Sequence, residues 1–111
     1  MIEVSFTSQG SRLSGFTVRG HSGLAPEGED ILCAAVTSAV RLTECAVNDV
    51  LGLEASVKVR SEDASISLKL PGGLDDTVDE ICQTLLTAMM VYLSGLQEEY
   101  PDNIIVLDME V

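Results

Sequence analysis

Residues 20–36, GHSGLAPEGEDILCAAV, join a strand-like run of residues to a long apolar segment. The run before them, residues 13–20, alternates in the manner of a β-strand. Asp30 is a good N-cap, and residues 31 to about 50 have the apolar periodicity of an α-helix that ends at Gly52. This stretch therefore predicts a strand, a loop and a helix in succession.

The flanking segments complete an α+β pattern. In several of these segments apolar and polar residues alternate as they do in β-strands, and Pro101 precedes the last predicted strand. A second long helix is predicted between the Pro71-Gly72-Gly73 break and Pro101. The strands are predicted at residues 2–7, 13–20, 53–60, 64–70 and 103–111. The order ββαββαβ predicts a single domain over residues 1–111, with a five-stranded sheet and two long helices.

The second helix begins in an acidic cluster that its macrodipole favours. Thr77 and Glu80 have the spacing of a capping box. The apolar stripe predicted to be buried comprises Val78, Ile81, Leu85, Met89, Tyr92 and Leu96. Residues 81–97 carry no charge but are too short and too polar for a membrane span. We expect this excess apolar surface to lie in a homodimer interface, and we expect no membrane partner.

The composition limits the possible partners. The chain has 18 Asp and Glu against 6 Lys and Arg, a net charge of −12. This field opposes binding along a phosphate backbone, so direct nucleic-acid binding is not expected, and a basic protein is the more natural partner. Three cysteines without a CxxC motif argue against a disulfide scaffold or a zinc cluster. The N-terminus resembles no signal peptide, so reduced thiols in a cytoplasm are expected.

Cys33 has the sequence environment of a reactive thiol. With Asp30 as N-cap, Cys33 is the third residue of the helix, where the dipole lowers a thiol pKa and free N–H groups can stabilise an oxyanion. Cys45, late in the same helix, and Cys82, beside acidic residues, lack this advantage. His21 ends the preceding strand, so it can lie near Cys33 and act as a general base.

Structural roles account for the same residues. A cysteine in an apolar helix is usually a small hydrophobe, and a single histidine is more often structural than catalytic. Capping explains Asp30 fully, and its charge would oppose a nearby thiolate. His21, Asp30 and Cys33 are at most three mixed ligands without a known metal spacing, so no metal or other cofactor is expected. The residues alone leave a Cys33–His21 dyad open.

The Gly20-His21 pair, the following loop and the string from Asp30 to Thr37, DILCAAVT, resemble the ribosomal-processing cysteine protease family, Prp. The resemblance extends to the length and element order of the chain. It implies that Cys33 is the nucleophile, His21 the base and Asp30 the motif aspartate.

The resemblance also implies a substrate and an assembly. Family members remove the N-terminal extension of large-ribosomal-subunit protein number twenty-seven, cutting after a phenylalanine in a hydrophobic motif. They look like homodimers with a loop over the active site. Here that substrate loop would contain Ser22, Gly23 and Leu24. The loop as a whole covers residues 22–29, and its two glycines, Gly23 and Gly28, suggest a lid. Thr37 stands where the family often has serine, and Leu24 where an aromatic residue is common.

Other classes of function remain open. One is a thiol-based hydrolase outside peptidase chemistry, or a redox-sensing thiol. Another is a non-proteolytic ribosome-assembly factor that binds the same ribosomal protein. Loss of peptide cleavage on Cys33→Ser separates a protease from an assembly factor, whereas a sulfenic acid formed under mild peroxide favours the sensor.

Overall fold

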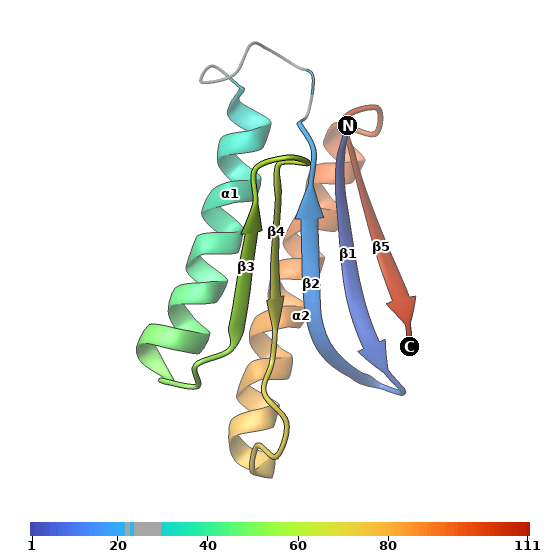
Figure 1. Ribbon diagram of the computed structural model, residues 1–111. Coiled ribbons are helices and arrows are strands. Elements are labelled where there is room, and N and C mark those ends of the chain that lie inside the picture. The colour runs from blue at the N-terminus through green and yellow to red at the C-terminus, as the bar shows by residue number, and fades with distance from the viewer. Residues whose placement is uncertain (22, 24–29) are drawn as a thin grey trace.

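A computed structural model describes residues 1–21, 23 and 30–111, and it confirms the order ββαββαβ (Figure 1). The first helix, α1, continues into a short π-helical segment, η1. The elements are β1 (Ile2–Gln9), β2 (Arg12–Arg19), α1 (Ile31–Glu44), η1 (Cys45–Val50), β3 (Ser56–Arg60), β4 (Ser65–Lys69), α2 (Asp76–Glu99) and β5 (Ile104–Glu110).

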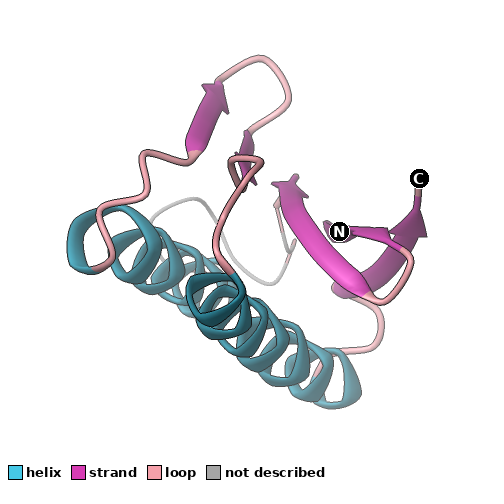
Figure 2. Cartoon of the chain, turned by 90° about the horizontal axis from the view of Figure 1, so that it is seen from below, coloured by secondary structure: helices cyan, strands magenta, loops and turns pink. Residues whose placement is uncertain are grey.

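The five strands form one sheet in the order β3-β4-β2-β1-β5. Neighbouring strands are antiparallel, except that β5 runs parallel to β1. Both helices lie on the same side of the sheet, and the described part of the chain places no helix on the other side (Figures 1 and 2). The predicted α+β class, with five strands and two long helices, is therefore correct.

One face of β1, β2 and β4 supplies most of the strand residues of the core, and Ile104 of β5 and the partly buried Val57 of β3 add to it. In β1 the side chains of Ile2, Val4 and Phe6 are at most 1% exposed, as the alternation predicts. Phe6 packs near Phe16 of β2, with ring centroids 6.0 Å apart. Residues of both helices complete the cluster, among them Leu32, Val36, Val40, Val47, Cys82, Leu86, Met89, Leu93 and Leu96.

The continuous helix of α1 and η1 begins and ends where the sequence predicts. The Asp30 carboxylate caps its first turn, and Gly52 follows it with φ +67°. Beyond it, the Asn48 side chain bonds the backbone N–H and C=O of Ala55 at 2.7 and 3.2 Å. Because these groups are engaged by Asn48, β3 begins only at Ser56, later than the predicted strand at residues 53–60.

Residues 31–50 also form a helix that is long and apolar enough to cross a membrane, with a mean hydropathy of 1.3 in its most apolar window. The core helix of a folded domain meets the same criteria. Here Leu32, Val36, Val40 and Val47 are at most 3% exposed and pack into the core.

α2 begins in the predicted acidic cluster, but without the capping box suggested for Thr77 and Glu80. Asp75, rather than Thr77, is the N-cap, and its carboxylate accepts the Val78 N–H at 2.9 Å. Thr77 already lies within the first turn, so it does not form the predicted capping box with Glu80. The acidic first turn itself is present, because Asp76 and Asp79 lie there.

The predicted buried stripe of α2 is partly wrong. Ile81 and Tyr92 are 41% and 53% exposed, whereas Cys82, Leu86 and Leu93 are completely buried. The Gln83 side chain bonds the backbone N–H and C=O of Leu13 in β2, at 2.7 and 2.8 Å. This pair of bonds helps to set the rotation of α2 on the sheet, which the apolar pattern leaves undecided. Met89 and Leu96 are buried as predicted.

Leu86→Ala tests this rotation. Removing a completely buried side chain leaves a cavity and should lower the free energy of unfolding by about 2–5 kcal/mol. Val91→Ala is the matched control, because Val91 lies in the same helix but is 64% exposed. It should lower the free energy of unfolding by less than about 1 kcal/mol. Urea denaturation followed by circular dichroism measures both. Equal effects of the two substitutions would contradict this placement of α2.

Candidate active site

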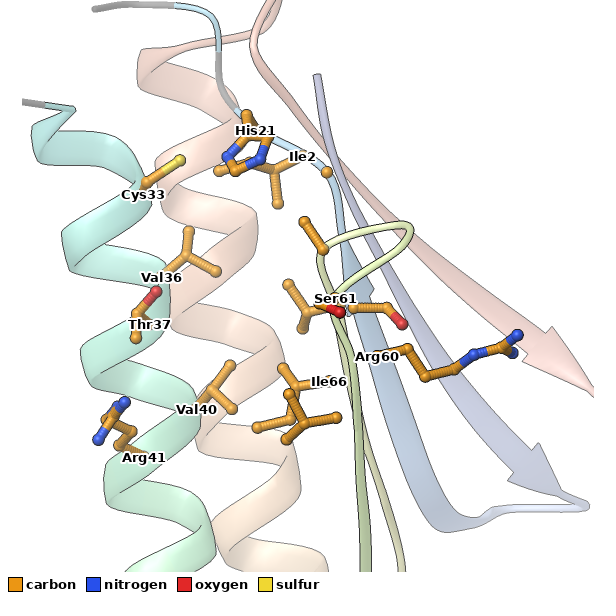
Figure 3. A pocket seen from close by; sticks show the side chains of 15 residues that line it. Ile2, His21, Cys33, Val36, Thr37, Val40, Arg41, Arg60, Ser61 and Ile66 are labelled. Atoms are coloured by element: carbon orange, nitrogen blue, oxygen red, sulfur yellow. The ribbon is translucent and has the colours of Figure 1, made fainter. Parts of the chain in front are cut away.

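A cavity of about 580 Å³ opens between α1 and the sheet, where β2 ends and the β3–β4 turn begins (Figure 3). His21 and Cys33 lie at one end of it. Apolar side chains line its length along α1 and β4. The lining residues include Ile2, Val18, Gly20, Val36, Thr37, Val40, Arg41, Val59, Ser61, Ala64 and Ile66.

Cys33 occupies the first turn of α1, where its thiol faces this cavity. Asp30 is only 8% exposed, and its Oδ1 accepts the Cys33 backbone N–H at 3.0 Å, so the cap is buried beside the thiol. The Asp30 carbonyl accepts the Ala34 N–H at 3.1 Å. Figure 3 shows the Cys33 sulfur directed toward the imidazole of His21. The structure thus brings the three predicted residues together.

The cap changes which backbone donors are available. The Cys33 N–H is not among the free donors expected in this turn, because it donates to the Asp30 carboxylate. In an α-helix the other early N–H groups, here those of Ile31 and Leu32, have no acceptor within the helix. Any backbone contribution to an oxyanion site from this turn would therefore come from these two residues.

His21 is positioned by the glycine before it. Gly20 has φ +90°, and a Cβ atom built on it would lie 2.5 Å from the Met1 carbonyl oxygen. The Gly20 N–H also donates to the Ala64 carbonyl at 3.2 Å, which joins the end of β2 to the β3–β4 turn. The imidazole is exposed at the mouth of the cavity.

The other two cysteines lie elsewhere. Cys45 is exposed at the start of η1, and Cys82 is buried in α2. Burial raises the pKa of the Cys82 thiol, and the nearby Asp79 carboxylate raises it further. This confirms the predicted influence of an acidic neighbour on Cys82.

The walls of the cavity were not predicted from sequence. Ser61 and Ala64 reach the site because β4 runs antiparallel to β2, which puts the start of β4 beside the end of β2. Pairing of the predicted strands 13–20 and 64–70 would have indicated this, but the order of strands cannot be derived from alternation alone. Val36 and Val40 do belong to the apolar periodicity predicted for residues 31 to about 50.

The substrate loop lies largely outside the described residues. Ser22 and Leu24 belong to that undescribed part. Gly23 is described, with φ +77° and open space around the position of a Cβ atom. Within residues 1–21, 23 and 30–111, no group of three or more His, Cys, Asp or Glu side chains could hold a metal ion.

A thiol at a helix start and an imidazole facing the same cavity are typical of cysteine-dependent hydrolases. Comparison with known proteins agrees. The model of the family described as cysteine protease Prp matches residues 1–105. The ribosomal processing cysteine protease Prp of Bacillus subtilis (strain 168) is 29% identical over 89 residues, which are 80% of each chain. The chain belongs to the cysteine protease Prp family.

Solved structures share the fold. Prp from S. aureus, an essential ribosomal processing protease in complex with a covalently linked product peptide, superposes with a TM-score of 0.80 at 22% identity, over 97% of this chain and 99% of that one. SMU.848 from Streptococcus mutans gives a TM-score of 0.83 at 24% identity, over 100% and 96%. A second S. aureus Prp structure contains a substrate peptide.

Gly20→Ala tests the positioning of His21. An alanine there must both adopt a positive φ and displace the Met1 carbonyl. Gly23→Ala is the control, because Gly23 also has a positive φ but a Cβ atom there would clash with nothing. We expect Gly20→Ala to lower the free energy of unfolding by about 1–3 kcal/mol more than Gly23→Ala does. Thermal unfolding compares the two variants. Equal stability would show that the Gly20–Met1 contact constrains nothing.

Proposed function

We propose that this chain is a cysteine endopeptidase that removes the N-terminal extension of large-ribosomal-subunit protein number twenty-seven during ribosome maturation, cutting after phenylalanine. The observation that carries the proposal is the cavity that has Cys33 and His21 at one end and apolar walls along its length. Membership of the Prp family supports the reaction class.

The first half of the reaction acylates the enzyme. His21 accepts the thiol proton of Cys33, and the thiolate attacks the carbonyl carbon of the scissile bond. The resulting oxyanion is stabilised by N–H groups at the start of α1. The intermediate collapses as the C–N bond breaks, and the imidazolium gives its proton to the departing amine. A thioester between Cys33 and the N-terminal fragment remains.

The second half restores the enzyme. Water attacks the thioester carbonyl as His21 takes one of its protons, and the C–S bond then breaks. The proton held by His21 returns to the sulfur of Cys33. The fragment leaves with a new carboxyl group, which ionises by releasing the second proton of the water to solvent. Asp30 is a positioning residue here: through its hydrogen bond to the Cys33 N–H, it sets the turn that presents the thiol.

The walls of the cavity suit an apolar peptide. Val36 and Val40 on α1 face Ile66 on β4 across it (Figure 3). A phenylalanine side chain buried there would leave water, which contributes about 2–3 kcal/mol to binding. Ser22, Gly23 and Leu24, between the base and the nucleophile in sequence, are proposed to contact the same peptide. The net charge of −12 favours association with a basic ribosomal protein in the cytoplasm.

We propose in addition that the protein is a homodimer. On the outer side of the helix pair, a second hollow of about 530 Å³ lies between α1 and α2. Leu42 and Tyr92, 71% and 53% exposed, flank a floor of small residues there. The predicted apolar excess of α2 is thus present on this surface, and a second copy of the helix pair would cover it.

Cys33→Ser and His21→Ala test the peptidase. With a synthetic peptide that contains the extension and its phenylalanine, cleavage followed by mass spectrometry should disappear in Cys33→Ser. It should fall by about 100-fold or more in His21→Ala, because the base is lost. Cys45→Ser, the substitution of an exposed thiol, is the control and should cleave normally.

Three outcomes of this experiment would contradict the proposal. Near-normal cleavage by a folded His21→Ala variant would exclude the dyad. Binding of the ribosomal protein without cleavage by the wild-type chain would favour an assembly factor. Ready formation of a Cys33 sulfenic acid with no cleavage would favour a redox sensor.

Tyr92→Glu tests the dimer. A carboxylate at the centre of an apolar interface cannot be solvated, so we expect this variant to sediment as a monomer at micromolar concentrations at which the wild type is a dimer. Thr77→Glu, on an exposed first-turn position of the same helix, adds the same charge and should remain dimeric. A monomeric wild-type protein would contradict the proposal directly.

A further inference from the structure

The side of the sheet without helices has a distribution of charge unlike that of the whole chain. In β1 the core side chains are even-numbered, so the odd-numbered residues face outward, and strand pairing extends these outward positions across the sheet. We call the surface formed by these outward positions the open face. It carries four of the six Lys and Arg residues: Arg19, Lys58, Arg60 and Lys69. Glu3 is the acidic residue at the paired outward positions of the described strands.

Only some of these cations have acidic neighbours. Arg19 pairs in register with Glu3, and Arg60 lies 3.8 Å from Glu62. Lys58 and Lys69 are exposed and form no salt bridge among the described residues. They lie on adjacent strands, β3 and β4, at one edge of the open face. The chain as a whole has a net charge of −12, but these two lysines form a local positive patch. Carboxylates of a partner would complement this patch.

The middle of the open face is built from small side chains. Ser5 pairs with Thr17 and Thr7 with Gly15, while Thr17 pairs in turn with Ser67. Gly15 admits no larger residue, because a Cβ atom there would clash with the Leu68 carbonyl oxygen. A hollow of about 330 Å³ lies over Thr7, Gly15, Thr17 and Ser67. Lys58, Lys69 and Val111 also line it.

The opposite edge of the open face is apolar. In β5, Ile105, Leu107 and Met109 pair with Glu3, Ser5 and Thr7, so their side chains project from the open face. Met109 is 53% exposed and the terminal Val111 is 81% exposed. The face is thus a shallow trough with a floor of small residues, a lysine wall and an apolar wall.

We infer that this trough binds an acidic amphipathic helix of a partner protein. Strands about 4.8 Å apart place the apolar wall on β5 roughly 14 Å from Lys69 on β4 and roughly 19 Å from Lys58 on β3, and a helix is about 10–12 Å across with its side chains. One helix on the floor can thus direct glutamates to Lys58 and Lys69 and leucines to Met109 and Leu107. This surface lies on the side of the sheet away from the helices, so the inference goes beyond the proposed peptidase activity.

A nucleic acid fits the trough less well. Phosphates would pair with the lysines but would leave the apolar wall exposed to water. Base stacking requires aromatic side chains, but both phenylalanines are buried in the core, and the two tyrosines lie in α2 and at its C-cap, away from this face. The combination of a basic and an apolar wall therefore favours a polypeptide.

The test uses a fluorescein-labelled synthetic helix of about 18 residues, long enough to be partly helical alone, with glutamates on one face and leucines on the other. Fluorescence anisotropy measures its binding to the full chain. We expect saturable binding that weakens by about tenfold or more in the double variant Lys58→Gln/Lys69→Gln. Met109→Ser should weaken it by about threefold to tenfold, because apolar burial is lost.

Matched controls separate the trough from general charge effects. Thr77→Glu/Thr84→Glu changes the net charge by the same amount as the lysine pair, but on exposed positions of α2, and should bind the helix normally. A peptide of the same composition in scrambled order should bind more weakly. Peptidase activity on a short substrate should persist in the lysine variant, so a failure of binding is distinguishable from a failure of the proposed activity.

Three results would overturn the inference. The first is no saturable binding, or binding that the lysine pair does not change. The second is equal affinity for the scrambled peptide, which would reduce the interaction to unspecific charge attraction. The third is tighter binding of a labelled RNA oligonucleotide of mixed sequence, with a steep salt dependence, which would assign the face to phosphates instead.

Discussion

Burial of one face of the sheet is the constraint on which the rest of this structure depends. Alternating apolar residues in the strands leave a single apolar face, and both helices must cover it. Because β2 leads to α1 through one connection, the end of that strand and the start of that helix meet at the same end of the domain. His21 and Cys33 are brought together by this arrangement.

The same constraint shapes the two surfaces outside the core. Between α1 and the β3–β4 hairpin, the helix covers the sheet incompletely and leaves the cavity beside Cys33. On the other side, the described residues place no helix, and the outward side chains are small or charged on β1 to β4 and apolar on β5. The start of α2 is acidic instead: Asp75 and Asp76 lie there, where backbone N–H groups stabilise their charges.

Much of the fold could be predicted from sequence because its signals are local. Alternation in β1, the cap at Asp30 and the glycine at residue 52 each depend on neighbouring residues, and the structure confirms them. The rotation of α2 could not be predicted, since apolar residues occupy more than one stripe of that helix. Hydrogen bonds from Gln83 to Leu13, 70 residues away in sequence, contribute to that choice.

The candidate site shows the same division between local and distant signals. The position of Cys33 in the first turn follows from the cap, and the structure confirms that position. The use of its N–H by Asp30 and the requirement for glycine at residue 20 depend on side-chain rotamers and on the distant Met1 carbonyl. Neither can be seen in the periodicity of the chain.

A peptide chloromethyl ketone that ends in phenylalanine tests the central claim most directly, because it alkylates a thiol only after binding beside it. Intact-protein mass spectrometry followed by peptide mapping identifies the modified residue. The account predicts one adduct, on Cys33, that is absent in Cys33→Ser and forms much more slowly in His21→Ala. An adduct on the exposed Cys45, or an equal rate without His21, would contradict it.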